Sequence, residues 1–325
     1  MPAVTTMIAG FDAGQTHTSC RLASLSDNGQ LQPLADGEGS GVSHLAAPGG
    51  DQRFTAALRS SLAAAQASAG LGAALPLAAA CIGASGIEAD SAVQARGQEL
   101  AAAALGIRPG LVVVTGDERT ALKGAFAVGA GVLVISGTGC IALGRAADGR
   151  SHRCGGWGWL LEGAGSALDI GRDGLALSVQ MADGRLADTP LRAALWQAIG
   201  ADSPQQVKAA VVAEGFAPAG FARLAPLVDR QALAGDGEAQ VVIQRSAEAL
   251  AAMVAAVARE LDLTAPAVYG VGGALQHLVG LRQGFSAALA HQCPGARLTA
   301  PGGDALDGAL ALAAEQLDSA ALRRR

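Results

Sequence analysis

The stretch Asp12-Ala13-Gly14-Gln15-Thr16-His17-Thr18 decides the fold of this chain. An apolar strand over residues 4–12 enters it and a second strand over 16–25 leaves it, so the pattern predicts a hairpin turn. Glycine in such a turn exposes backbone N–H groups, and threonine hydroxyls add further donors, which together suit a phosphate group. Asp12, at the end of the first strand, is placed to hold Mg²⁺ directly or through water. An ordinary turn whose aspartate and glycine serve only its geometry is the competing interpretation.

The same pattern restarts in the second half of the chain. Residues 132–135 form a short apolar run, Ser136-Gly137-Thr138-Gly139 a tight turn, and residues 140–145 a return strand. Further strands are predicted at 31–36, 77–84, 111–114, 268–271 and 296–298, and helices at 51–69, 91–105, 117–128, 275–290 and 304–318, with a mostly helical stretch over 166–260. Strands that alternate with helices after an opening meander indicate an α/β layer fold.

Composition limits the classes of protein that the chain can belong to. A length of 325 residues suits two domains, and 50% hydrophobic residues can fill their cores without disulfides. The net charge of −5, without a basic stripe, argues against a nucleic-acid partner. Five scattered cysteines without a CxxC pair predict reduced thiols in the cytoplasm. Neither a signal peptide nor a membrane-spanning segment is expected.

Asp117 is the candidate catalytic residue. It follows the apolar run Val112-Val113-Val114 through Thr115-Gly116 and opens a predicted helix. The carboxyl end of a strand is where α/β folds place their ligands, so this carboxylate is suited to accept a proton from a substrate hydroxyl. Aspartate is also a common helix N-cap, and that structural role competes with the catalytic one.

Two glycine-rich stretches complete the set of motifs. Cys154-Gly155-Gly156-Trp157-Gly158 exposes backbone and an indole edge together, which suits a sugar. A structural loop whose tryptophan packs in the core is the competing interpretation. Gly270-Val271-Gly272-Gly273-Ala274 ends a strand and enters a helix. Because glycine has no Cβ, adenine and ribose can lie close to the backbone at this strand end. The same glycines can also simply allow the helix to pack tightly on the strand.

The ordered set of motifs resembles a known family. DAGQTHT (12–18), VTGDERTA (114–121), ISGTG (135–139), CGGWG (154–158) and VGGA (271–274) are similar to those of the N-acetylglucosamine kinases. More broadly, the chain resembles the ATPase family that includes activators of 2-hydroxyacyl-CoA dehydratases and benzoyl-CoA reductases. The resemblance implies two ribonuclease-H-like, actin-like ATPase domains around a nucleotide cleft. The first is expected over residues 1–117 with the C-terminal helix 304–325, and the second over 118–303.

The resemblance also implies the ligands and the residues that bind them. It implies ATP and Mg²⁺ as cofactors, an amino sugar as substrate and phosphorylation of the sugar 6-hydroxyl, and it is compatible with a homodimer. Asp117 is the expected general base and Asp12 the residue near the metal. The expected nucleotide-binding residues are Gly14, Gln15, Thr16, Gly137, Thr138, Gly139, Ala222, Gly272 and Gly273. The expected sugar-binding residues are Ser43, His44, Asp117, Gly156, Trp157 and Glu162.

The chain departs from the family pattern at three positions. Gln15 stands where the family commonly has glycine, Ser43 where it has asparagine, and Gly163 where it has an aspartate that binds the sugar. Glu162, one position earlier, is predicted to bind the sugar in place of that aspartate. These changes keep glucosamine or another amino sugar open as substrate. An ATPase activator of a radical dehydratase is the alternative from another class, and the scattered cysteines argue against its iron–sulfur cluster.

Overall fold

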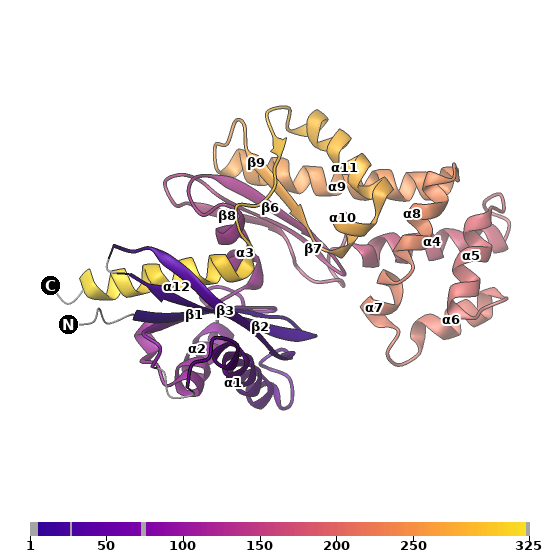
Figure 1. The fold of residues 1–325 in the computed structure, drawn as a ribbon. Helices are drawn as coiled ribbons and strands as arrows, with labels where there is room; N and C mark the ends of the chain where they lie inside the picture. The colour runs from indigo at the N-terminus through magenta and orange to yellow at the C-terminus, as the bar shows by residue number, and fades with distance from the viewer. Residues whose placement is uncertain (1–5, 27, 73–75, 323–325) are drawn as a thin grey trace. The chain divides into compact units, whose positions relative to one another are not determined.

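The computed structural model describes residues 6–26, 28–72 and 76–322 of the chain, so residues 4 and 5 of the first predicted strand and residues 323–325 of the C-terminal segment lie outside the described residues. The chain folds into two compact units (Figure 1). The first comprises residues 1–128 and 300–325, and the second residues 129–299.

The first unit is built on a five-stranded sheet in the order β3-β2-β1-β4-β5. Its strands are β1 (Thr6–Ala13), β2 (His17–Leu25), β3 (Leu31–Ser40), β4 (Ala79–Ala84) and β5 (Val112–Thr115). The first three pair antiparallel as a meander, and β4 and β5 extend the sheet in parallel with β1. A short 3-10 turn, η1 (Pro109–Leu111), leads into β5.

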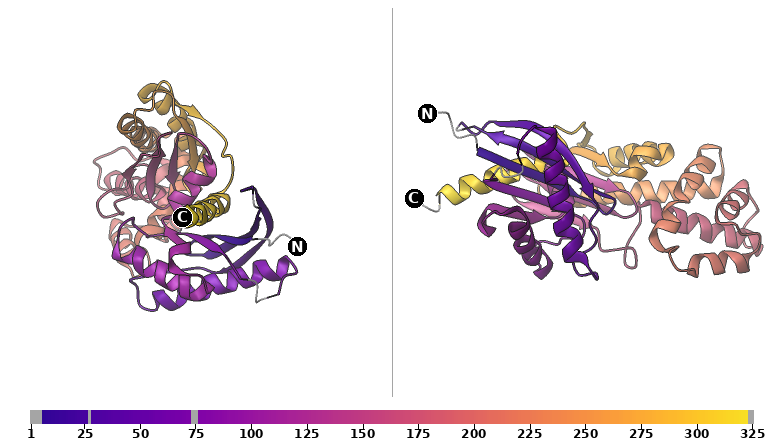
Figure 2. Two further views of the ribbon diagram at one scale, coloured as in Figure 1. Left: turned by 90° about the vertical axis from the view of Figure 1, so that its left-hand side faces the viewer. Right: turned by 60° about the horizontal axis from the view of Figure 1, so that its bottom comes forward.

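Alternation along β1 explains how helices cover both faces of this sheet. Ala9 and Phe11 belong to the core that includes α1 (Gly50–Ser68) and α2 (Ala92–Leu105), whereas Ile8 packs against α12 (Ala305–Leu322). Gly10 lies on the α12 face, where an added Cβ would stand 2.9 Å from the carbonyl oxygen of Leu306. Helix α3 (Asp117–Ala125) packs on α12, so the C-terminal helix is an integral part of the first unit (Figure 2).

The second unit repeats this topology. Its sheet has the order β10-β9-β6-β7-β8. Read from the β8 edge, this is the order of the first sheet, with β6 to β10 in the places of β1 to β5. The strands are β6 (Gly131–Ser136), β7 (Cys140–Arg145), β8 (Ser151–Gly155), β9 (Ala267–Val271) and β10 (Arg297–Leu298). Again the first three are antiparallel and the last two parallel to the first. The pattern that was predicted to restart in the second half of the chain is therefore present as a repeated strand order.

Helices fill the sequence between β8 and β10. They are α4 (Ala167–Ala182), α5 (Pro190–Ile199), α6 (Pro204–Val212), α7 (Ala217–Ala222), α8 (Ala225–Leu233), α9 (Gly237–Glu260), α10 (Gly273–His277) and α11 (Val279–Gln292). Helix α9 packs on β6, β7 and β8 and along α11. Among the described helices, α9 alone is long and apolar enough to cross a membrane. However, 56% of the 18-residue apolar segment on which this rests is buried in the protein. Its apolarity is that of a core helix.

The predicted fold class, two α/β domains that each open with strand, turn and strand, is confirmed by this architecture. The boundaries differ from those expected. The first unit runs to Val128 rather than to Asp117, because α3 packs on α12 and both lie on the first sheet.

Candidate active site

The carboxyl edge of the parallel strands of the first unit gathers the predicted acidic residues. Asp12 on β1 is in register with Gly83 on β4, and Gly83 is in register with Thr115 on β5. Asp117 follows Thr115 by two residues and begins α3. Glycine is required at position 83, because the side chain of Thr120 occupies the space where its Cβ would stand. The edge of the sheet therefore brings Asp12 and the start of α3 together, as expected for a ligand site in this class of fold.

Asp12 is partly buried and has two other acidic side chains nearby. Burial raises the pKa of this carboxyl, the negative charges of Asp117 and Asp304 raise it further, and His17 opposes them. Asp12 on β1 therefore lies within electrostatic range of Asp117 at the start of α3 and of Asp304 at the start of α12. A site of this kind favours a bound cation, because the cation relieves the repulsion between the carboxylates.

Asp117 is the first residue of α3 and not its N-cap. The cap position is Gly116, whose backbone is extended and which offers no side chain, so the competing N-cap interpretation is wrong in its simple form. The Asp117 carboxylate accepts a hydrogen bond from the Glu118 N–H at 3.0 Å, and its main-chain carbonyl accepts one from the Thr120 hydroxyl at 2.9 Å. The half-buried carboxylate is held at the positive end of the helix dipole.

Glu118 is a residue that the sequence interpretation did not single out. Its side chain folds back over Gly116, in the space that a Cβ there would need. Burial raises the pKa of Glu118 to about 7, and Asp117 contributes to the rise. In the sequence, only the place of Glu118 beside Asp117 at the start of a predicted helix pointed to it. The burial of its side chain depends on tertiary packing, which the sequence does not reveal.

The first predicted phosphate turn is exposed and braced from one side. Gly14 donates its N–H to the His17 carbonyl at 3.1 Å and accepts a hydrogen bond from the Val42 N–H at 2.9 Å. The side chains of Gln15 and Thr16 are exposed. Gly41 lies against the backbone of Gln15 so closely that a Cβ would overlap it. The segment after β3 therefore fixes the turn and leaves its side chains accessible.

Ser43 and His44 lie in the same segment, and neighbouring groups orient both. Arg53 on α1 donates from Nε to the Ser43 hydroxyl at 2.8 Å. His44 Nδ1 accepts the Ala46 N–H at 3.2 Å, so the neutral imidazole carries its proton on Nε2. The imidazole packs on Gly86, just beyond the carboxyl end of β4, where φ is +81°. The pair thus joins the same edge of the sheet as Asp12.

The second predicted phosphate turn lies against a helix start and a glycine-rich strand end. Gly137 accepts the Ala167 N–H at 2.8 Å, which ties the turn to the first residue of α4. Ser136 donates its hydroxyl to the Gly165 carbonyl at 2.6 Å. Gly272, with φ of +98°, touches the backbone of Ser136, so only glycine fits there. Thr138 and Gly139 are exposed at the tip of the turn. A helix N-terminus and an exposed turn beside each other suit a bound phosphate.

The predicted sugar-binding loop of the second unit contains an unpartnered carboxylate oxygen. Gly156 has φ of +79° and lies on Ile141, and the Trp157 side chain is 62% exposed with the Arg153 guanidinium 4.4 Å from its ring. Glu162 Oε2 is buried and has no hydrogen-bond partner among the described residues. Burial raises the pKa of Cys140 to about 12, and the charge of Glu162 adds to the rise. This carboxylate is available to accept hydrogen bonds from a ligand.

The remaining predicted nucleotide positions occupy separate elements. Gly273 begins α10 directly after β9, whereas Ala222 ends α7, which packs on α4 where Gly171 meets the Phe221 carbonyl. A hollow of about 630 Å³ lies among α4, α6 and α7, and its wall includes Phe221 but none of the predicted site residues.

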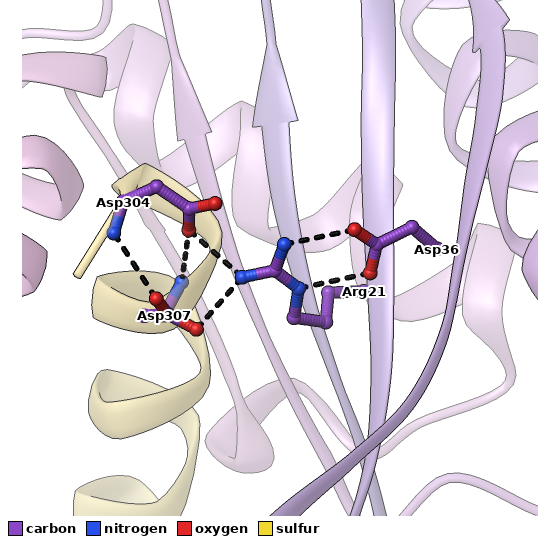
Figure 3. Close-up of polar contacts among 4 residues, drawn as sticks. All are labelled: Arg21, Asp36, Asp304 and Asp307. Carbon is purple, nitrogen blue, oxygen red and sulfur yellow. Dashed lines mark hydrogen bonds and ion pairs between the residues drawn. The ribbon is translucent and has the colours of Figure 1, made fainter.

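A polar network at the start of α12 was missed by the sequence interpretation (Figure 3). Arg21 on β2 donates two hydrogen bonds to Asp36 on β3, both at 2.8 Å, and from Nη1 reaches Asp304 at 2.9 Å and Asp307 at 2.7 Å. Asp304 and Asp307 also exchange backbone-to-carboxylate bonds, which form a capping box around the helix start. Arg21 and Asp304 lie 283 residues apart in sequence, so no local sequence pattern predicts the network.

The residues around Asp12 fit Mg²⁺, a hard cation that binds carboxylates and retains several waters. The fit rests on the half-buried Asp12 carboxylate, whose pKa is raised by burial and by the negative charges of Asp117 and Asp304. Within residues 6–26, 28–72 and 76–322, no three His, Cys, Asp or Glu side chains form a group that could hold a metal ion. A metal here would therefore be held by few protein ligands together with water and phosphate.

Comparison with known proteins decides the family. Residues 9–299 match the BadF/BadG/BcrA/BcrD ATPase family. The chain belongs to this ATPase family. The resemblance inferred from the ordered motifs is confirmed, because the match spans both units and all five motifs.

Relatives of this ATPase include named sugar kinases. It is 28% identical over 211 residues to the N-acetylmuramic acid/N-acetylglucosamine kinase of Clostridium acetobutylicum, covering 64% of this chain and 69% of that protein. It is 33% identical over 138 residues to the N-acetyl-D-glucosamine kinase of Dictyostelium discoideum, but that match covers only 42% of the relative. A crystal structure from Chromobacterium violaceum, provisionally assigned as an N-acetylglucosamine kinase, has 29% identity and a TM-score of 0.74 over 96% of this chain and 99% of that one.

Proposed function

We propose that this ATPase is an ATP-dependent amino-sugar kinase that phosphorylates N-acetylglucosamine or a close relative at the 6-hydroxyl. The observation that carries the proposal is the edge formed by Asp12 and Asp117 in a chain whose relatives are named as kinases of such sugars. The fold alone would not be enough to assign this activity, because one fold hosts many functions.

Asp117 serves as the general base in this proposal. Its carboxylate takes the proton of the sugar 6-hydroxyl while that oxygen forms a bond to the γ-phosphorus and the bond to the β-phosphate oxygen breaks, releasing ADP. The N–H of Glu118 and the start of α3 hold the carboxylate in place. Ser43, His44, Gly156, Trp157 and Glu162 are proposed to hold the sugar.

The nucleotide is proposed to bind through both turns. Gln15 and Thr16 in the first unit and Thr138 and Gly139 in the second donate hydrogen bonds to phosphate oxygens. Gly14 and Gly137, whose N–H groups bond to His17 and Gly139 within the turns, shape the turns and let the phosphates approach the backbone. Gly272, Gly273 and Ala222 are proposed to line the adenosine. Asp12 would hold Mg²⁺ through water. When bound, this ion neutralises phosphate charge.

A coupled ADP-release assay tests the proposal. The purified protein is supplied with MgATP and, one at a time, N-acetylglucosamine, glucosamine, N-acetylmannosamine, N-acetylmuramic acid and glucose. We expect ADP release that depends on an amino sugar, and ³¹P NMR should place the new phosphate at the 6-position. ATP hydrolysis at the same rate with and without every sugar would overturn the proposal.

A further inference from the structure

Helix α12 is seated directly beside the proposed metal residue. Gly10 and Asp12 are two residues apart on β1, so they face the same side of the sheet, and α12 rests on Gly10 through Leu306 and Leu310. The first turn of α12 therefore lies next to Asp12. Asp304 precedes that turn, and its charge acts on Asp12.

Arg21 ties that first turn to β2 and β3. Its guanidinium is inserted between Asp36 on one side and Asp304 and Asp307 on the other, with only 16% of the side chain exposed (Figure 3). Arg21 is in register with Gly10, the residue on which α12 rests. The planar fork fixes direction as well as distance, which the single ammonium of lysine cannot do for three carboxylates at once.

We propose that Arg21 is a positioning residue for phosphoryl transfer, which holds Asp304 beside Asp12 so that both carboxylates serve the hydrated Mg²⁺ of the nucleotide. The inference rests on the proposed function, since it assigns the metal to Asp12. Asp304 contributes negative charge and a water-binding oxygen, while Arg21 touches neither nucleotide nor sugar. Oδ1 of Asp304 accepts hydrogen bonds from the Asp307 N–H within the capping box and from Arg21, both at 2.9 Å, so the two contacts together hold its carboxylate.

Binding of a non-hydrolysable ATP analogue as a function of Mg²⁺ concentration tests this inference without any turnover. Asp304→Asn preserves the helix cap, since asparagine caps as well as aspartate, but removes the charge. Arg21→Met removes one of the two hydrogen bonds to the Asp304 carboxylate oxygen together with the neighbouring positive charge, and Arg21→Lys keeps the positive charge without the guanidinium fork. We expect Asp304→Asn and Arg21→Met to raise the Mg²⁺ concentration at half-saturation about fivefold or more, and Arg21→Lys to fall between these and wild type.

Asp36→Asn is the matched control. It removes the negative charge and one of the two Arg21 bonds toward β3 while the bonds from Arg21 to Asp304 and Asp307 stay, so it should lower the melting temperature without moving the Mg²⁺ dependence. In turnover assays, Arg21→Met should lower kcat and leave the sugar KM within twofold of wild type. If Arg21→Met and Asp304→Asn lose stability like the control but bind Mg²⁺ and nucleotide as wild type does, the positioning role is wrong. Failure of wild-type protein to phosphorylate any amino sugar would overturn the proposed function alone, because the binding measurement needs no sugar.

Discussion

Gly124 of α3 lies with its Cα against the main-chain carbonyl of Asp304, so closely that a Cβ on Gly124 would overlap that oxygen. Gly308, one turn into α12, meets the Thr120 carbonyl in the same way. Two glycines thus allow α3 and α12 to pack backbone to backbone. Because Asp117 begins one of these helices and Asp304 precedes the other, this packing sets the distance between two acidic residues of the candidate site.

Gly124→Ala should therefore destabilise the first unit. The atom that a new methyl group would strike is a backbone carbonyl, which cannot rotate away as a side chain would. Overpacking of this kind typically costs about 1–3 kcal/mol of unfolding free energy. Urea denaturation monitors the change. Gly110→Ala is the control in the same unit, since no atom stands within 4 Å of a Cβ there. Equal stabilities for the two variants would show that α3 and α12 separate freely.

Glu118 should make stability depend on pH in a specific direction. Its pKa is raised in the folded protein from the ordinary value of 4.5 to about 7. The folded state therefore holds this proton more tightly than the unfolded state, so stability is present in full below pH 4.5 and is lost as the pH rises toward 7. Glu118→Gln removes the titration. Compared with wild type, this variant should gain up to about 3 kcal/mol of unfolding free energy at about pH 8.

The same comparison at pH 4.5 provides the check. There the wild-type glutamate is protonated in the folded protein and half-protonated in the unfolded one, so the two proteins should unfold at nearly the same urea concentration. A constant difference between them from about pH 4.5 to about pH 8 would mean that Glu118 does not change its protonation in this range.

The sequence predicted the local elements of this fold well, and its long-range contacts poorly. Strands such as 140–145 and turns such as Ser136–Gly139 follow from apolar runs and glycines a few residues apart, and the structure has them. The repeated strand order was suggested by the two strand–turn–strand openings, but the neighbours of β4 and β9 follow only from tertiary pairing. The Arg21 network joins residues from opposite ends of the chain, which no periodicity can reveal.

The candidate site shows the same division. Asp12 was found because it ends an apolar strand and Asp117 because it follows one by two residues, and their nearness follows from the register of β1, β4 and β5. Asp304 and Glu118 were missed because their importance depends on burial and on a neighbouring charge. The competing N-cap role of Asp117 was a reasonable expectation from composition, and backbone geometry placed Gly116 at the cap instead.

Asp117→Asn should abolish phosphoryl transfer and leave nucleotide binding within a few-fold of wild type. The amide retains the shape of the carboxylate but cannot accept the hydroxyl proton, a contribution worth roughly 10²–10⁴-fold in rate. Single-turnover kinetics measure the loss, and calorimetry with a non-hydrolysable nucleotide measures binding. Glu118→Gln is the neighbouring control, and should retain most of its turnover at neutral pH. Near-wild-type transfer by Asp117→Asn would remove this residue from the role of base.

Glu162 provides the sharpest test of the sugar assignment. One oxygen of its carboxylate is buried without a partner among the described residues. Burial raises the pKa values of Cys140 and Cys154, and the charge of Glu162 raises both further. A buried acceptor without a partner lowers stability until a ligand satisfies it. If sugar hydroxyls are the missing donors, each hydrogen bond to this charged acceptor contributes about 1.5–3 kcal/mol.

Glu162→Gln should then raise the sugar KM by about tenfold or more and leave the KM for ATP almost unchanged, as measured by the coupled assay. Glu248→Gln, on the exposed side of α9, is the control for removal of one negative charge and should change neither constant. A purely structural Glu162 predicts a different result, in which both KM values stay within twofold of wild type. That result would leave Gly163 without a substitute for the family aspartate, and would favour a sugar that presents fewer hydroxyls to this loop.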